Sequence, residues 1–288
     1  MKASSTPSSL PEPMTRIALF QSRTGIDPAE NATALVAAVE QAAHGGAEML
    51  FTPEMSGLLD RDSARAADKL RREEEDEVLA ACRAAARDNG IWLHLGSLAV
   101  RTDEERLANR GFVIDATGEI RARYDKIHLF DVDLPTGESW RESAVYRPGS
   151  GAVVVTGTPV GALGLSICYD LRFAALFARL AEAGAETIAV PAAFTVPTGR
   201  AHWEVLLRAR AIEAGLFVIA AAQCGRHADG RETYGHSLVV GPWGELLLDM
   251  GDALGVGFAE VDLSRVKDVR ERVPVLAHRR DIAEAVRQ

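Results

Sequence analysis

Cys168 is the residue whose type and position most directly suggest chemistry. In the segment "GLSICYDLRF" (164–173), it closes a strand-like run, 164–168, and a predicted helix begins a few residues later. A side chain at such a corner emerges from the sheet, and unpaired N–H groups at the helix start can stabilise developing negative charge. A thiol with an ordinary pKa of about 8.5 is mostly protonated at neutral pH, so a nucleophilic cysteine needs a base. The pattern allows two interpretations, a nucleophile or an ordinary cysteine at a strand end.

Candidate partners for this thiol also stand at predicted strand ends. Glu54 leaves a buried strand in "FTPEMSG", and Lys126 opens the segment "YDKIHLFD" directly after another strand. Three histidines could supply the base of a Cys–His pair instead: His128, His202 and His236. None of them stands in a recognisable protease signature. Taken singly, Glu54 and Lys126 are equally consistent with surface charges, and spacing alone does not place them beside Cys168.

The other cysteines and histidines do not predict a metal site or a disulfide. Three widely spaced cysteines argue against a disulfide framework. Cys82 lies in an alanine-rich helix and is read as a small buried residue, whereas Cys224 is ambiguous. The run "HWE" at 202–204 lacks the H-E-x-x-H spacing, and Cys224 with His227 is only half of a zinc site. We therefore expect no metal, and the absence of phosphate-binding glycine motifs predicts no nucleotide cofactor.

The elements that must position these residues alternate between strand and helix. Helices are predicted at 28–44, 73–89, 173–183 and 202–214, with a short basic helix near the C-terminus. Strands are predicted at 15–21, 47–52, 91–100, 108–114, 119–125, 164–168, 186–191, 216–223, 237–250 and 255–263. The segment 126–151 has no clear periodicity and is expected to be a long functional loop. This alternation indicates an α/β layered fold in one domain, 15–288.

Composition limits the possible partners. Almost half of the 288 residues are hydrophobic and a quarter are charged, the balance of a soluble globular protein. The net charge of −9, without a basic stripe, argues against nucleic acid. The longest apolar run, 216–222, is too short for a membrane span. Residues 1–14 are rich in Ser and Pro and lack an apolar signal core, so we expect a disordered tail and a cytoplasmic protein.

Three segments, "FTPEMSG", "RYDKIHLFDVDLP" and "GLSICYDLRF", resemble the signature segments of the nitrilase, or carbon-nitrogen hydrolase, superfamily. They occur in the family's order and at its usual separations. The similarity continues through "AAFTVPTGRAHWEVLLRARAIE" and "YGHSLVVGPWGE" and covers the chain from about Thr15 onward. The resemblance implies a four-layer αββα sandwich and a homodimer or higher oligomer, usually formed through the helical face that follows the nucleophile.

The resemblance also implies roles for individual residues. Cys168 would be the nucleophile, Glu54 its general base, and Lys126 the cation that stabilises the tetrahedral intermediate. Glu142, in "WRESAVYRPG", would orient the lysine and the substrate. The backbone N–H of Tyr169 would form half of an oxyanion hole, and no cofactor or metal is required. The expected reaction is hydrolysis of a small amide through a cysteine thioester, with release of ammonia or an amine.

Substrate choice is read from the later segments. "TGRAHWEVLLRARAIE" and "AAAQCGRH" look most like the branch that hydrolyses deaminated glutathione, an α-keto acid derivative. The sister branch, ω-amidase, cleaves α-ketoglutaramate, and both substrates carry an α-keto carboxylate. Arg172 is the predicted cation for that carboxylate, unless it braces the corner by pairing with Asp170 or a backbone carbonyl. Phe194 and Thr198 are further predicted substrate-binding residues.

Two other functional classes and one departure from the family pattern bear on this reading. A nitrilase would use the same residues through a thioimidate. A non-catalytic interaction protein is disfavoured because the four polar residues of the family site are intact. Ala174 and Ala175 stand where relatives commonly carry Pro-Glu, a change expected to affect the helix start or a subunit contact.

Overall fold

The computed structural model describes residues 14–104, 106–133, 137 and 139–287. The predicted disordered tail, apart from Met14, lies outside the described residues, and the domain boundary at Thr15 stays a prediction. The α-helices are α1 (Pro28–His44), α2 (Ser63–Ala67), α3 (Glu77–Asn89), α4 (Ala174–Glu182), α5 (Val196–Ala214) and α6 (Ser264–Arg272). Short 3₁₀ helices are η1 (Glu73–Glu75), η2 (Glu142–Ala144) and η3 (Cys168–Arg172).

The strands form two large sheets and two small hairpins. The first sheet has the order β17 (Gly255–Val261), β1 (Thr15–Gln21), β2 (Met49–Phe51), β4 (Trp92–Arg101), β5 (Leu107–Ile114) and β6 (Ile120–Asp125), with β3 (Arg71–Arg72) beside β4. The second has the order β16 (Leu246–Asp249), β15 (Leu238–Val240), β12 (Phe217–Ala220), β11 (Thr187–Ala189), β10 (Gly161–Leu165) and β9 (Val154–Thr158). The hairpins are β7 (Asp131–Asp133) with β8 (Ser139–Arg141), and β13 (Cys224–Arg226) with β14 (Glu232–Tyr234).

Each large sheet has a parallel centre and antiparallel flanks. In the first sheet β1, β2 and β4 run parallel, and in the second β10, β11 and β12 do so. Connections between parallel strands need a crossover, which explains the helices between them. Ligand sites in such sheets form beyond the carboxyl ends of the strands. Cys168 follows β10 and Glu54 follows β2, so both lie beyond such an end.

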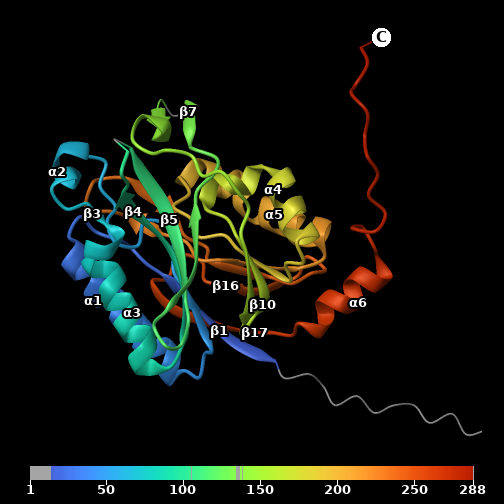
Figure 1. Ribbon diagram of the computed structural model, residues 1–288, viewed down its shortest axis with the longest axis horizontal. Coiled ribbons are helices and arrows are strands. Elements are labelled where there is room, and N and C mark those ends of the chain that lie inside the picture. Colours follow the sequence, from blue (N-terminus) through green and yellow to red (C-terminus); the bar gives the residue numbers. More distant parts are fainter. Residues whose placement is uncertain (1–13, 105, 134–136, 138, 288) are drawn as a thin grey trace, which may run out of the picture.

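Side-chain alternation along the strands builds the layers. Ile17 and Leu19 of β1 belong to the core cluster shared with the second sheet, whereas Ala18 packs with residues of α1 and α3. Successive strand residues point to opposite faces of a sheet. One face of the first sheet therefore packs against the second sheet, and the other packs against α1 and α3. Figure 1 shows α1 and α3 at one side of the molecule and α4 and α5 at the other. This arrangement confirms the predicted four-layer αββα sandwich.

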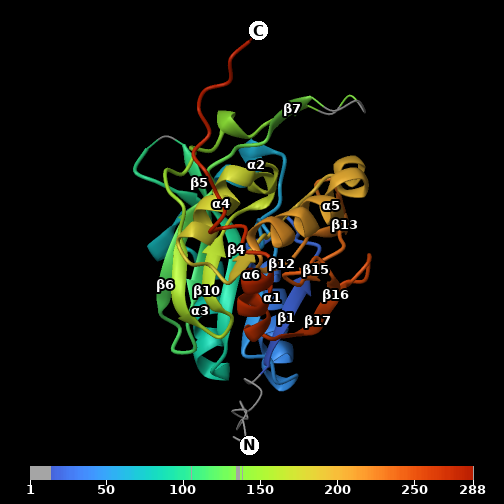
Figure 2. The same cartoon turned by 90° about the vertical axis from the view of Figure 1, so that its right-hand side faces the viewer.

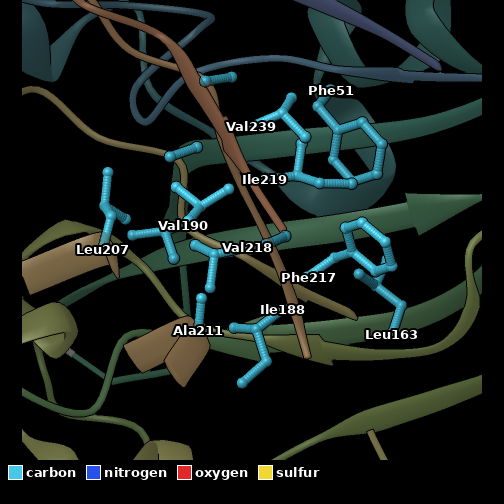
Figure 3. Packing of buried hydrophobic residues seen from close by; sticks show 14 of the residues in the cluster. Phe51, Leu163, Ile188, Val190, Leu207, Ala211, Phe217, Val218, Ile219 and Val239 are labelled. Carbon is cyan, nitrogen blue, oxygen red and sulfur yellow. The ribbon is translucent and has the colours of Figure 1, made fainter. Parts of the chain in front are cut away.

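The core between the sheets is aromatic and aliphatic. In Figure 3, Phe217 of β12 lies on the side of Phe51 of β2, whereas Val218 lies on the side of Leu207 and Ala211 of α5. All five side chains are at most 1% exposed. Burial of large side chains of this kind stabilises a fold by about 1.5–3 kcal/mol each. This packing contributes to holding the second sheet against the first sheet on one face and against α5 on the other. Among the described residues, no helix has both the length and the apolarity needed to cross a membrane.

Two predicted helices begin elsewhere than the pattern suggested. The predicted helix 73–89 starts at Glu77, because the Asp76 side chain caps it by accepting the Leu79 N–H at 2.9 Å. Glu73 instead pairs with two arginine side chains of the first sheet, Arg110 and Arg123. The predicted helix 202–214 starts at Val196, six residues earlier.

The segment 126–151 is more ordered than expected. It contains β7, β8 and η2, with 134–136 and 138 outside the described residues. In Figures 1 and 2, β7 lies at the same end of the molecule as α2. Residues of both α2 and β8 line the cavity described below.

Candidate functional site

A cavity of about 450 Å³ brings most of the predicted site residues together. The predicted residues that line it are Glu54, Lys126, Glu142, Cys168, Tyr169, Phe194 and Thr198. Its wall also includes residues of α2, β8 and the β13–β14 hairpin. A volume of this size suits a small organic substrate rather than a macromolecule.

Cys168 sits on a strained turn between β10 and α4. Its φ of 49° lies in the left-handed region, which non-glycine residues occupy only when the surroundings hold them there. The Cys168 N–H donates to Pro191 O at 2.9 Å, next to β11. Asp170 accepts from the Ile167 N–H at 2.9 Å and from the Tyr124 hydroxyl at 2.7 Å. These bonds fix the turn that carries the thiol.

Tyr169 follows the cysteine as the second residue of η3. The first N–H groups of a helix have no acceptor within the helix. The Tyr169 N–H is therefore the kind of donor that can bind a developing oxyanion. The Tyr169 ring lines the cavity and packs edge-to-face on Phe130 and Phe173.

The loop that carries Glu54 is held from two sides. Gln223 Nε2 donates to Glu54 O at 2.9 Å, and the Met55 N–H donates to Ser97 Oγ at 2.9 Å. Gly96 of β4 allows the close approach, because a Cβ there would lie 2.1 Å from Thr52 O. The carboxylate therefore leaves β2 in one orientation.

Lys126 lies between the buried carboxylate of Glu54 and the partly buried carboxylate of Glu142. Its Nζ donates to Glu54 Oε1 at 2.9 Å and to Glu142 Oε2 at 2.9 Å, and its side chain is 2% exposed. The Phe130 N–H donates to Glu142 Oε2 at 2.6 Å, and the Ala193 N–H donates to Glu54 Oε2 at 3.0 Å. Burying these charges would be costly without such pairing.

Asn109 of β5 joins the same two carboxylates and was not found by sequence reasoning. Its Nδ2 donates to Glu54 Oε1 at 2.9 Å and to Glu142 Oε1 at 3.1 Å, and the residue is 1% exposed. Carboxylates only accept hydrogen bonds, so the amide must present its NH₂ group to them. The one available signal was an asparagine, which is depleted in strands, inside the apolar run "LANRGFVI".

The pKa shifts follow from burial and from this pairing. Burial alone would raise the pKa of Glu54, but Lys126 and the hydrogen bonds from Cys168, Lys126 and Asn109 lower it. Burial opposes the charge on Lys126, yet the two glutamates raise its pKa well above the ordinary value. Burial and the neighbouring Glu54 raise the pKa of Cys168 well above its ordinary value. These directions favour a neutral Cys168 thiol, an ionised Glu54 carboxylate and a charged Lys126 ammonium group.

Arg172 is the predicted site residue that is not part of the cavity wall. Its guanidinium lies over the rings of Tyr169 and Phe194, 5.8 and 5.5 Å from their centroids, and Nη1 is 3.2 Å from His202 Nδ1. Tyr169 and Phe194 line the cavity, whereas Arg172 does not. The hydrogen bond to His202 also differs from the Asp170 or carbonyl brace considered above.

The alternative histidine bases do not line the cavity. His128 Nδ1 is 2.7 Å from Asp170 Oδ1, and His236 Nδ1 is 3.0 Å from Asp249 Oδ1. His227 has both ring nitrogens within hydrogen-bond distance of oxygens, Thr24 O and Thr233 Oγ1. In the part of the chain that the structure describes, no group of three or more His, Cys, Asp or Glu side chains has a metal-binding arrangement.

The remaining cysteines are separate from the site. Cys82 is fully buried in α3, and burial raises the pKa of its thiol to about 12. Cys224 begins β13 and its Sγ lies 3.4 Å from Asp252 O. Of the three cysteines, all within the described residues, Cys168 is the one that lines the cavity.

Comparisons with known proteins agree on one family. A family model for carbon-nitrogen hydrolases matches residues 16–271. The deaminated glutathione amidase of Yersinia enterocolitica is 38% identical over 273 residues, 94% of this chain and 94% of that protein. The NitFhit protein of Caenorhabditis elegans has a TM-score of 0.86 at 38% identity, covering 94% of this chain and 66% of that chain.

A third relative bears on the cysteine. A mutant amidase from Nesterenkonia sp. shows covalent addition of the acetamide moiety of fluoroacetamide at its active-site cysteine. It has a TM-score of 0.76 at 28% identity, covering 92% of this chain and 94% of that chain. The chain therefore belongs to the carbon-nitrogen hydrolase family, as its signature segments predict.

Proposed function

We propose that this protein is an amidase that hydrolyses deaminated glutathione through a thioester on Cys168. The observation that carries the proposal is the buried cluster in which Lys126 joins Glu54 and Glu142 beside the Cys168 thiol. A carboxylate base, a neutral thiol and a fixed cation are the parts that acyl transfer from an amide requires. The covalent adduct at the active-site cysteine of the Nesterenkonia amidase supports the same assignment.

In the proposed acylation step, Glu54 accepts the thiol proton as Sγ bonds to the amide carbon. The lowered pKa of Glu54 keeps this base ionised, whereas the raised pKa of Cys168 means that the proton moves only during attack. Lys126 Nζ and the Tyr169 N–H stabilise the oxyanion, and one such donor contributes about 3 kcal/mol. Glu142 and Asn109 hold Lys126 and Glu54 in place.

The leaving amine departs when Glu54 returns the proton to its nitrogen and the C–N bond breaks. Water then replaces the amine, Glu54 removes one of its protons, and the hydroxyl adds to the thioester carbon. Collapse of this second intermediate breaks the S–C bond, and Glu54 reprotonates the thiol. For deaminated glutathione, the products are α-ketoglutarate and cysteinylglycine.

The substrate assignment rests on relatives and on the cavity. The Yersinia protein, matched along 94% of both chains, is a deaminated glutathione amidase. Cations line the cavity wall, in keeping with a substrate that carries carboxylates: Arg61, Arg101, Arg141 and Arg231. α-Ketoglutaramate and simple nitriles remain the alternative substrates, because the same chemical groups would serve both.

A product-release screen tests the proposal. The purified protein is incubated with deaminated glutathione, α-ketoglutaramate, a simple amide and a nitrile, and cysteinylglycine or ammonia is measured. We expect deaminated glutathione to have the highest kcat/KM. A higher value for α-ketoglutaramate or the nitrile would reject the substrate assignment, and no turnover of any substrate would reject the amidase mechanism.

We also propose that the protein forms a homodimer or higher oligomer. Val205 and Ile212, two helical turns apart on α5, are 68% and 51% exposed, and large exposed apolar groups favour an interface. Light scattering on the wild type and on Val205→Glu tests this, since a monomeric wild type would refute it. A cytoplasmic location stays a prediction.

A further inference from the structure

Arg231 is a cation that the protein fixes in place at the cavity wall. It lies in the turn between β13 and β14, and its Nε donates to Asp229 Oδ2 at 2.7 Å. The Asp229 side chain is fully buried and also accepts the Arg231 N–H at 3.0 Å. The two terminal nitrogens of Arg231 have no recorded partner among the described residues. The guanidinium is therefore oriented through Nε, and its two terminal nitrogens are left for a ligand.

Asp229 also ties a second arginine to the same place. It accepts the Arg61 N–H at 2.9 Å, which joins the loop after Glu54 to the β13–β14 turn. The guanidinium groups of Arg61 and Arg231 lie 5.8 and 5.2 Å from the centroid of the Trp140 ring. All three side chains line the cavity. An aromatic face stabilises guanidinium groups that would otherwise repel each other.

Two other charged groups at this wall have carboxylate or arginine partners of their own. Arg141 makes a two-pronged ion pair with Asp133, and the Asp60 carboxylate is paired with Arg65. No side-chain hydrogen bond or ion pair is recorded for Arg61 within the described residues. Glu232 is exposed. Arg231 is ion-paired with Asp229 through Nε, so the cavity-wall arginines without a carboxylate partner among the described residues are Arg61 and Arg101.

We propose that Arg231 and Arg61, stacked on Trp140, form a subsite that binds a substrate carboxylate remote from the scissile amide. The inference rests on the proposed function and replaces Arg172 as the predicted carboxylate ligand. The free edge formed by the two terminal nitrogens of Arg231 matches a carboxylate, whereas a lysine would not. Deaminated glutathione carries two such carboxylates, one on the keto acyl part and one on the glycine of the leaving dipeptide.

Binding to a Cys168→Ala protein tests the subsite without turnover. Calorimetry compares deaminated glutathione, the same compound with its glycine carboxylate converted to an amide, and α-ketoglutaramate. Each is titrated into proteins that also carry Arg231→Met, Arg231→Lys or Arg61→Met. Arg226→Met is the matched control, because Arg226 is exposed on the same hairpin and does not line the cavity.

We expect Arg231→Met to raise the Kd for deaminated glutathione about 10- to 100-fold, the loss of a charge-assisted hydrogen bond, and Arg226→Met to leave it unchanged. If Arg231→Met raises the Kd much less for the compound whose glycine carboxylate is an amide, the subsite binds the leaving dipeptide. If Arg231→Met raises the Kd for α-ketoglutaramate by the same factor, the subsite binds the carboxylate of the acyl part. Arg231→Lys should recover only part of the affinity.

Arg61→Met keeps the test decisive if Arg231→Met does not fold, because the Arg61 side chain is exposed and should be replaceable without unfolding. Folded variants that bind all three compounds as tightly as the parent would overturn the subsite. Wild-type turnover of deaminated glutathione is measured in parallel. If the wild type turns it over while the variants bind normally, only the subsite fails; absence of both turnover and binding rejects the proposed function as well.

Discussion

Replacing Asn109 with leucine tests whether the amide positions the proposed base. Leucine fills similar space, but it removes the donor shared by Glu54 Oε1 and Glu142 Oε1. The hydrogen bond from Asn109 is one cause of the lowered pKa of Glu54. Its loss should raise that pKa, so a base that must be ionised becomes protonated at a higher pH. The acidic limb of the kcat/KM profile should therefore move toward higher pH.

The size of the effect follows from the two bonds. A hydrogen bond to a charged group contributes about 1.5–3 kcal/mol, and both acceptors here are largely buried. The free energy of unfolding should fall by about 3 kcal/mol or more, which a fold stabilised by about 5–15 kcal/mol can survive. Loss of the hydrogen bond from Asn109 to Glu54 alone corresponds to a decrease in kcat/KM of about 10- to 100-fold.

The assay is the pH dependence of kcat/KM, with thermal unfolding as the check on folding. Asn109→Asp should be less active than Asn109→Leu at neutral pH, because it places a third carboxylate beside two others. Asn89→Ala, at the end of α3 and away from the cavity wall, is the control. A folded Asn109→Leu protein with an unshifted acidic limb and kcat/KM within about twofold of wild type would show that Asn109 does not position Glu54.

Two further outcomes follow from the site. Arg172→Ala should change kcat/KM equally for a carboxylate substrate and a neutral amide, because the Arg172 guanidinium contacts aromatic rings rather than the cavity. It should also lower the free energy of unfolding by about 1 kcal/mol. An increase in KM confined to the carboxylate substrate would contradict this. Burial and Glu54 raise the pKa of Cys168. The ultraviolet difference spectrum between wild type and Cys168→Ala should therefore show no thiolate band near pH 8.5, where an ordinary thiol with a pKa of about 8.5 ionises. A band with a midpoint at or below that value would reject the neutral resting thiol.

Short sequence patterns predicted many of the helices and strands, because the signals that start and end these elements come from neighbouring residues. β1 and α1 have the predicted bounds, 15–21 and 28–44, and Gly90 ends α3 in the left-handed region. The predicted start of α5 was late, and the missed first turn contains Pro197 and Gly199, residues with low helix propensity. Proline is tolerated at the first helical turn, and Gly199 lies against the Tyr234 ring, where a Cβ would be 2.2 Å from Cγ.

The site was predictable only in part, because its residues meet across two sheets. Glu54 follows β2 of the first sheet and Cys168 follows β10 of the second, so no spacing along the chain reports their proximity. The resemblance of the signature segments supplied that information. Asn109 and Arg231 were missed because their roles depend on contacts that form only in the folded chain. The left-handed φ of Cys168 is likewise a tertiary effect.

In the proposed mechanism, Cys168 forms the acyl thioester with Glu54 as its base. Rapid-quench mass spectrometry of the enzyme mixed with deaminated glutathione measures this directly, with peptide mapping of the modified residue. We expect a transient keto-acyl adduct on the peptide that contains Cys168. The adduct should be absent from Cys168→Ala and should form far more slowly in Glu54→Gln. Turnover retained in Cys168→Ala, or an adduct on Cys82 or Cys224 instead, would contradict it.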